Sequence, residues 1–118
     1  MNTFVCYEKC TTCQKAKKWL EEQGAAYTLR PIKEQNPTAQ ELAQWVEQSG
    51  LPVKKFINTS GLLYKSMGLK DRLPGMTQQE ILDLLATDGM LVKRPILITP
   101  KGVMPGFKAE QWQELLQD

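Results

Sequence analysis

The sequence contains no histidine, and this absence excludes more chemistry than any other feature of its composition. Without an imidazole, the chain cannot form a Ser-His or Cys-His nucleophile pair, a histidine-ligated zinc site, or an imidazole acid–base couple. Any catalysis by this protein must therefore depend on other side chains.

The sequence also lacks a strong charge of either sign and any long apolar run. Lysine and arginine number 15 against 13 acidic residues, a net charge of +2 that is too small for a typical nucleic-acid-binding domain. No apolar stretch approaches the roughly 20 residues that cross a bilayer, and residues 1–5 do not resemble a signal peptide. We therefore expect neither a direct nucleic-acid partner nor a membrane partner.

Cysteine is scarce, and all three cysteines lie near the N-terminus, at Cys6, Cys10 and Cys13. Small secreted domains held together by disulfides usually carry an even number of cysteines spread along the chain. The odd, clustered set instead favours a reducing compartment, so the expected location is cytoplasmic.

The first quarter of the chain has the pattern of a strand, a helix and a second strand. Residues 3–7 and 26–30 favour strands, and residues 15–23 carry apolar side chains at helical spacing before Gly24. About 20 residues join the two strands, which is the length of a crossover connection. The two strands are therefore expected to be parallel, with a right-handed crossover.

The middle of the chain is expected to be helical. Two T-x-x-E capping boxes begin at Thr38 and Thr77, and glycines predict the ends of the two helices at Gly50 and Gly89. Together with a short helix between them, they predict a helical insertion over about residues 37–89. That short helix is expected to be capped by one of two hydroxyl residues and to end at a glycine, namely Thr59 or Ser60 and Gly68.

The last third returns to strands. Residues 95–99 and 103–104 flank a turn at 100–102 and predict a hairpin, and a final helix carries Trp112 on its apolar stripe. This order predicts an α/β fold of the thioredoxin-like (glutaredoxin-like) class, with a mixed four-stranded sheet flanked by helices and a helical insertion. We expect a single domain over 1–118, in which residues 1–31 and 91–118 form the core.

The sequence Cys10-Thr11-Thr12-Cys13 lies between the first predicted strand and the first predicted helix. The free amides and the dipole at a helix N-terminus stabilise a thiolate, and Lys9 adds a positive charge nearby. Cys13 precedes Ala16 by three residues and so belongs to the inward-facing stripe of the helix. Cys10 is therefore the expected nucleophile, and Cys13 the thiol that resolves its mixed disulfide.

The cysteines allow three other interpretations. Cys10 and Cys13 would serve equally as small apolar residues, although a C-x-x-C at a strand-to-helix junction is a recognised redox arrangement. A structural zinc site needs four ligands, and this chain offers three cysteines and no histidine. The spacing from Cys6 through Cys10 to Cys13 also matches radical SAM iron–sulfur enzymes, but 118 residues are too few for their barrels. We therefore expect no metal and no cofactor, with Cys6 as a buried strand residue.

Several segments together resemble one known family. They are Cys10-Thr11-Thr12-Cys13 with the following Lys15-Ala16-Lys17-Lys18-Trp19-Leu20, then Asn58-Thr59-Ser60-Gly61, Lys93-Arg94-Pro95-Ile96 and Gly106-Phe107-Lys108. They look like the Spx and arsenate reductase (ArsC-like) family, and the resemblance covers nearly the whole chain. It implies a thioredoxin-like fold, a cis proline at Pro95, a nucleophile at Cys10 and an oxyanion-binding Arg94. It also implies reduction of arsenate with electrons from a small thiol, glutaredoxin or thioredoxin.

The chain departs from the arsenate reductases of this family at two further arginines. Asn58 stands where one of them is found, and residues 99–108 contain no arginine. Glu8 stands where the family usually has a proline, two residues before the nucleophile. We therefore expect weak oxyanion binding, from a substrate-binding set of Thr11, Thr12, Asn58, Ser60 and Pro95 beside Arg94.

The Spx branch of the family implies an alternative function. Spx is a redox-switched regulator that binds the C-terminal domain of the RNA polymerase α-subunit, and Gly50 falls where that branch has its interaction glycine. In this alternative, closing a Cys10–Cys13 disulfide would alter a surface near Gly50, Lys54 and Lys55.

Overall fold

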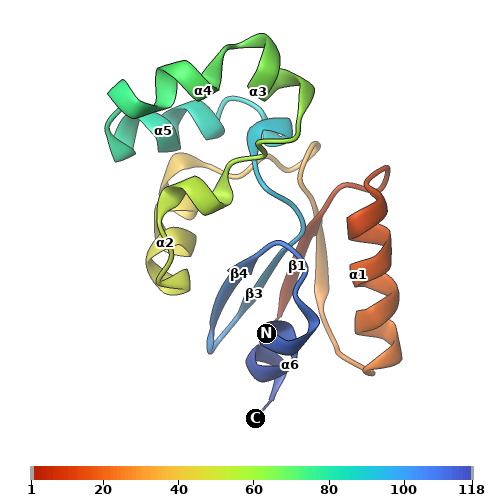
Figure 1. Cartoon of the computed structure of the whole chain (residues 1–118). Coiled ribbons are helices and arrows are strands. Elements are labelled where there is room, and N and C mark those ends of the chain that lie inside the picture. Colours follow the sequence, from red (N-terminus) through yellow and green to blue (C-terminus); the bar gives the residue numbers. More distant parts are fainter. Residues whose placement is uncertain (1, 118) are drawn as a thin grey trace.

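The computed structural model describes residues 2–117, whose strands form one four-stranded sheet in the order β2-β1-β3-β4 (Figure 1). The first two strands are parallel, whereas β3 runs antiparallel to both β1 and β4. In chain order the elements are β1 Thr3–Cys6, α1 Thr11–Glu22, β2 Thr28–Pro31, α2 Ala39–Ser49, η1 Val53–Phe56, α3 Leu62–Ser66, α4 Leu69–Arg72, η2 Leu73–Gly75, α5 Gln78–Leu85, η3 Gly89–Leu91, β3 Ile96–Thr99, β4 Gly102–Pro105 and α6 Ala109–Leu116.

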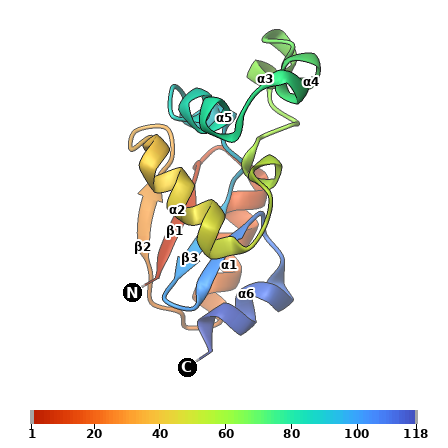
Figure 2. The same ribbon diagram turned by 90° about the vertical axis from the view of Figure 1, so that its left-hand side faces the viewer.

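Helices cover both faces of the sheet because successive strand side chains point to opposite sides. In β1, Val5 joins one buried cluster while Phe4 and Cys6 join the other, and in β3 the neighbours Ile96 and Leu97 divide in the same way. Helices α1 and α6 lie on one face and α2 on the other (Figure 2). The mixed sheet flanked by helices that the sequence predicts is therefore confirmed.

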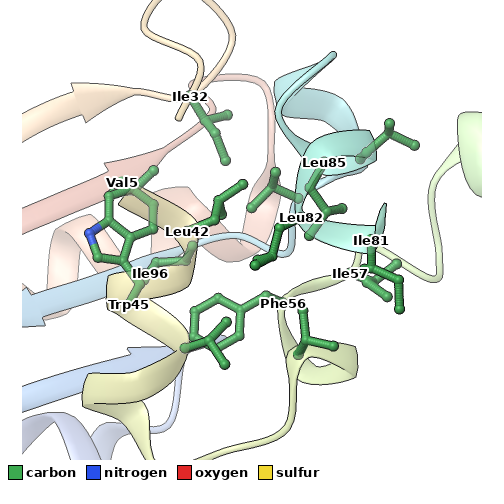
Figure 3. Packing of buried hydrophobic residues seen from close by; sticks show 14 of the residues in the cluster. Val5, Ile32, Leu42, Trp45, Phe56, Ile57, Ile81, Leu82, Leu85 and Ile96 are labelled. Atoms are coloured by element: carbon green, nitrogen blue, oxygen red, sulfur yellow. The ribbon is translucent and has the colours of Figure 1, made fainter. Parts of the chain in front are cut away.

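The larger core joins the sheet to the helical segment between β2 and β3. Leu42 and Trp45 of α2 belong to one buried cluster with the sheet residue Ile96 and with Leu82 and Leu85 of α5 (Figure 3). Because one apolar cluster includes both parts, α2 and α5 are held against the sheet. The division into a core and an insertion at residues 37–89 stays a prediction.

The smaller core, on the side of α1 and α6, is aromatic. Trp112 of α6 is fully buried and meets the rings of Phe4, Trp19 and Phe107, with centroids 5.1–6.3 Å apart. Its indole N–H donates to the carbonyl oxygen of Gly106 at 2.9 Å. This packing fixes α1 against the sheet through Trp19, and with it the N-terminal end of α1.

Both predicted capping boxes are present. The side chains of Thr38 and Thr77 each accept a hydrogen bond from the amide three residues later, and the carboxylates of Glu41 and Glu80 accept one from the N-cap amide in return. Gly50 ends α2 in the left-handed conformation, as expected. The predicted hairpin of β3 and β4 is also confirmed.

Two expectations about the helical segment were wrong. The short helix α3 is capped by Gly61 rather than by Thr59 or Ser60. Its predicted end is confirmed, because Gly68 follows the C-cap Met67 in the left-handed conformation and leads into α4 and η2. Gly89 does not end α5 as a left-handed residue; it lies in η3, where a Cβ atom would be 2.2 Å from the carbonyl oxygen of Ile32. Glycine is required there because two backbone segments meet closely.

The short helices α3 and α4 and the helix α5 project beyond the end of the sheet at which β1 ends and α1 begins (Figures 1 and 2). Within residues 2–117, no helix combines the length and the apolar composition that crossing a bilayer requires.

We predict that Gly89→Ala destabilises the fold by about 1–3 kcal/mol or more, because the new methyl group would overlap the backbone of Ile32. Chemical unfolding followed by circular dichroism measures the loss. Gly75→Ala is the matched control, since nothing lies within 4 Å of its Cβ position and its φ is not left-handed. Equal unfolding midpoints for the two variants would contradict the proposed backbone contact.

Candidate active site

The candidate site is at the junction between β1 and α1. Cys10 is the N-cap of α1, with an extended backbone (φ −90°, ψ 121°), and its amide donates to the carbonyl oxygen of Tyr7 at 3.0 Å. This tight turn places Cys10 directly before the free amides of the first helical turn. The side chain is half-buried, so that a substrate can still reach it.

The environment of Cys10 favours its thiolate. Partial burial alone would raise its pKa, but the combined hydrogen bonds from the amide and thiol of Cys13 and the amide of Thr12 reverse this effect. The positive charge of Arg94 acts in the same direction. The pKa of Cys10 is therefore lowered from its ordinary value, as expected for a thiol at a helix N-terminus.

Cys13 is held in the opposite state. It is 2% exposed, and burial raises its pKa to about 12, although the amide of Tyr7 donates to its sulfur at 3.4 Å. The neighbouring Cys10 and the charge of Cys6 contribute to this rise in the pKa. Cys13 is thus a buried, protonated thiol one turn after Cys10.

Cys6 is buried at the end of β1, as the sequence predicts. Burial raises its pKa, and the nearby Lys17 only partly opposes that rise. The exposed Glu8 acts on Cys6 in the same direction as burial. Cys6 therefore remains a protonated thiol within the sheet.

Arg94 lies across from Cys10 on the loop before β3. Its guanidinium carbon is 5.1 Å from the ring centroid of Tyr7, and Nη1 donates to the carbonyl oxygen of Met90 at 3.5 Å. The Arg94–Pro95 peptide bond is cis, as expected from the family resemblance. Nε of Arg94 is buried and has no hydrogen-bond partner among residues 2–117. A buried donor without a partner is costly, so this nitrogen is suited to an incoming acceptor.

Asn58 is next to Arg94, because its side-chain amide donates to the same carbonyl oxygen of Met90 at 3.2 Å. Of the other expected substrate-binding residues, Thr12 offers its amide to Cys10, and Pro95 is joined to Arg94. Thr11 and Ser60 are exposed, and Ser60 lines neither of the two cavities beside the cysteine pair. The structure thus brings together all of the expected residues except Ser60 and the Thr11 side chain.

Sequence reasoning missed Tyr7 and Met90. Tyr7 supports both halves of the site, with its ring under Arg94 and its amide at the sulfur of Cys13. Met90 contributes only its carbonyl oxygen, which no side-chain pattern reveals. The sequence predicts that the positive charge of Lys9 stabilises the Cys10 thiolate. In the structure, Lys9 is exposed beside the cavity that holds Cys6 and Cys13, and the positive charge that lowers the pKa of Cys10 is that of Arg94.

No group of three or more His, Cys, Asp or Glu side chains within residues 2–117 is arranged to hold a metal ion. The side chains that the candidate site does offer are a reactive thiol, a second thiol and a guanidinium.

We predict that iodoacetamide alkylates Cys10 before Cys6 or Cys13 at neutral pH, because only Cys10 combines exposure with a lowered pKa. Peptide mass spectrometry ranks the three rates. The pH midpoint for Cys10 should rise in Arg94→Gln, which loses the stabilising charge, and should not change in the control Arg72→Gln on α4. Faster alkylation of Cys13 or Cys6 would show that the nucleophile is assigned wrongly.

The chain is similar to several known proteins. The chain is 50% identical over 112 residues to the uncharacterized protein YusI of Bacillus subtilis, covering 95% of each chain. It is 30% identical to the regulatory protein MgsR of the same organism over 89% of this chain and 82% of the relative. It is also 27% identical to the global transcriptional regulator Spx of Staphylococcus saprophyticus, over 98% and 87% of the two chains.

Solved structures show the same relationship. A crystal structure of an ArsC-family-related protein from Bacteroides fragilis is 54% identical, with a TM-score of 0.94 over 97% of this chain and 96% of the other. The arsenate reductase from Vibrio cholerae is 26% identical, with a TM-score of 0.87 over 98% and 97%. A sequence model of the ArsC family matches residues 6–115, which include both cysteines of the pair, Arg94 and Pro95. The chain therefore belongs to the ArsC family.

Proposed function

We propose that this protein is a thiol-dependent reductase of the arsenate reductase type, with Cys10 as its nucleophile, Cys13 as its resolving thiol and Arg94 as the cation that assists the bound anion. The observation that carries this proposal is the opposite state of the two thiols. One is a half-exposed thiol with a lowered pKa at the N-cap of α1, and the other, one turn later, is a buried thiol whose pKa is about 12.

This arrangement supports a two-step reaction. The Cys10 thiolate attacks the substrate first, because only it is both ionised and accessible. Once Cys10 is in a covalent bond with the substrate, its negative charge is gone, and the charge repulsion that raises the pKa of Cys13 disappears with it. Cys13 then more readily loses its proton and attacks the sulfur of Cys10, which releases the reduced product and leaves a disulfide.

Arg94 supports the step in which negative charge accumulates. Its Nε is buried without a partner among residues 2–117, and its guanidinium is held over Tyr7. A fixed guanidinium of this kind can donate hydrogen bonds to a bound oxyanion or stabilise a departing thiolate. A small thiol, glutaredoxin or thioredoxin would return the disulfide to the dithiol state.

We predict weak arsenate reduction, because Asn58 and residues 99–108 do not supply the two further arginines. Each charge-assisted hydrogen bond contributes roughly 1.5–3 kcal/mol, so losing two lowers binding and turnover by several powers of ten. Arg94→Ala should remove most of the remaining activity, whereas Asn58→Arg should raise it. Steady-state kinetics with a glutaredoxin or thioredoxin donor measures all three proteins.

Peptide mapping after turnover provides a control for the cysteine assignment. The product should contain a Cys10–Cys13 disulfide and free Cys6, and Cys10→Ser should be inactive. Robust arsenate reduction that survives loss of Arg94 would remove the oxyanion part of the proposal, and a dominant disulfide of Cys6 would remove the cysteine assignment.

A second candidate function is favoured by the relatives named as regulators, Spx and MgsR. In it, the protein binds the C-terminal domain of the RNA polymerase α-subunit, and the cysteine pair controls binding. Gly50 at the end of α2 is exposed, and so are Lys54 and Lys55 in η1, which makes this surface accessible to a partner.

We predict that a pull-down with the purified C-terminal domain of the polymerase α-subunit fails for both the reduced and the oxidised protein if the enzyme proposal is right. The double variant Lys54→Glu with Lys55→Glu serves as the matched control, since charge reversal should abolish binding through this surface. Redox-dependent capture of the wild type that this double variant loses would favour the regulator over the reductase.

A further inference from the structure

A groove with an unbalanced positive charge runs beside the cysteine pair. It has a volume of about 520 Å³, and four cations line it: Lys55, Lys93, Arg94 and Lys108. No acidic side chain is among its lining residues, and none of these four cations is in an ion pair within residues 2–117. The four positive charges of the groove exceed the net charge of the whole chain, which is +2, so the groove is more positive than the rest of the molecule.

The cations come from separate parts of the chain. Lys55 is in η1, Lys93 and Arg94 precede the cis proline, and Lys108 is the N-cap of α6. The fold therefore gathers like charges that repel one another. Such an arrangement costs stability unless a ligand of opposite charge offsets it.

The groove borders the reactive thiol without enclosing it. Thr12, whose amide stabilises the thiolate of Cys10, lines one side, and Arg94, whose charge lowers the pKa of Cys10, lines another. Cys10 itself is not among the lining residues. A ligand bound in the groove would thus lie next to Cys10. The disulfide that Cys10 attacks would lie just outside the groove.

The lining also includes apolar side chains, among them Leu51, Met104 and Phe107. A mixture of cations and apolar groups fits a peptide that carries acidic and apolar residues, because each kind of side chain finds a matching surface. A nucleic acid fits less well, since its bases offer no disulfide to Cys10.

The cavity on the other side of the pair provides a comparison within the same molecule. It has a volume of about 380 Å³ and is lined by Cys6 and Cys13, but its charges are mixed, with three lysines beside Glu8 and Glu34. Of these two cavities beside the cysteine pair, the groove that borders Cys10 is the one lined by cations without an acidic side chain. Its charge is therefore associated with the nucleophile and not with the resolving thiol.

We propose that the cationic groove binds an acidic segment of a protein disulfide substrate, so that Cys10 preferentially attacks disulfides flanked by Asp or Glu. This inference rests on the proposed function of Cys10 as the nucleophile. The Cys10 thiolate attacks one sulfur of the partner's disulfide, and a Cys10–partner disulfide forms. The partner's other sulfur leaves with the electron pair of the broken bond and takes a proton from water.

The second step completes the electron balance. Cys13 gives its proton to water and attacks the sulfur of Cys10, and the partner's first sulfur leaves as a thiolate that is then protonated. The partner's disulfide has gained two electrons, and the cysteine pair has lost two to become a disulfide. An external dithiol reduces the pair again for a further turnover, whereas the peptide assay below follows a single turnover of the reduced protein without added reductant.

The test uses three peptides with one cysteine activated as a 2-pyridyl disulfide and flanked by Glu, Gln or Lys. Release of 2-thiopyridone measures the attack of Cys10 on each peptide, and each rate is divided by the rate with 2-mercaptoethanol to remove intrinsic reactivity. We expect the Glu peptide to react at least about tenfold faster than the Gln peptide, and the Lys peptide to react more slowly. The preference should shrink as salt is added.

Variants locate the preference. The triple variant Lys55→Gln, Lys93→Gln and Lys108→Gln should react equally with the Glu and Gln peptides. The matched control is Lys33→Gln, Lys65→Gln and Lys70→Gln, which removes the same charge outside the groove and should keep the preference. A preference that survives in the groove variant, or is lost equally in the control, would overturn the proposal.

The two proposals fail differently. If the Gln peptide does not modify Cys10 at all, the proposed nucleophile is wrong. If the Gln peptide modifies Cys10 and the Glu peptide has no advantage, only the acidic-segment inference is wrong. The last comparison uses the disulfide of mercaptoacetate, a small dianion, against the uncharged disulfide of 2-mercaptoethanol. A roughly tenfold preference for the dianion, with no preference for the Glu peptide over the Gln peptide, would assign the groove to small carboxylates. That result would overturn the proposal of a protein substrate.

Discussion

The different environments of the two thiols at the start of α1 are the constraint on which the candidate chemistry depends. They differ because Cys10 occupies the N-cap of α1 while Cys13, one turn later, is buried against the sheet. An N-cap residue faces amides that have no partner within the helix, and the side chain of Cys10 is also half-exposed. Cys10 thus combines stabilisation of negative charge with access, whereas the buried Cys13 has neither.

The rest of the fold serves to hold that junction in place. The aromatic cluster of Trp112, Trp19 and Phe107 fixes the inner side of α1, and β1 delivers the chain to the turn that begins at Tyr7. Arg94 approaches from the loop before β3, where the ring of Tyr7 supports its guanidinium. Because β1 is paired with β3, the residues that precede β3 reach the same edge of the sheet as those that follow β1.

Local patterns allowed much of this to be predicted from the sequence, and long-range contacts account for the rest. The capping boxes at Thr38 and Thr77 and the C-x-x-C pair depend on residues within one turn of each other, so their spacing was sufficient. The prediction for Gly89 was wrong because its need for glycine arises from the carbonyl of Ile32, distant in sequence. The shared carbonyl of Met90 leaves no trace in the sequence at all, because every residue has one.

Asn58 provides a neutral amide where the arsenate reductases of the family have an arginine, and this difference bears on which substrate suits the site. Its side chain already donates to the carbonyl oxygen of Met90, next to Arg94, and it adds no charge. A tetrahedral oxyanion with several charged oxygens needs several cations around it, whereas a disulfide develops its charge on one departing sulfur. A single guanidinium matches the second requirement better than the first. We therefore expect the chemistry of this chain to favour sulfur substrates over oxyanions, with Arg94 stabilising one thiolate at a time.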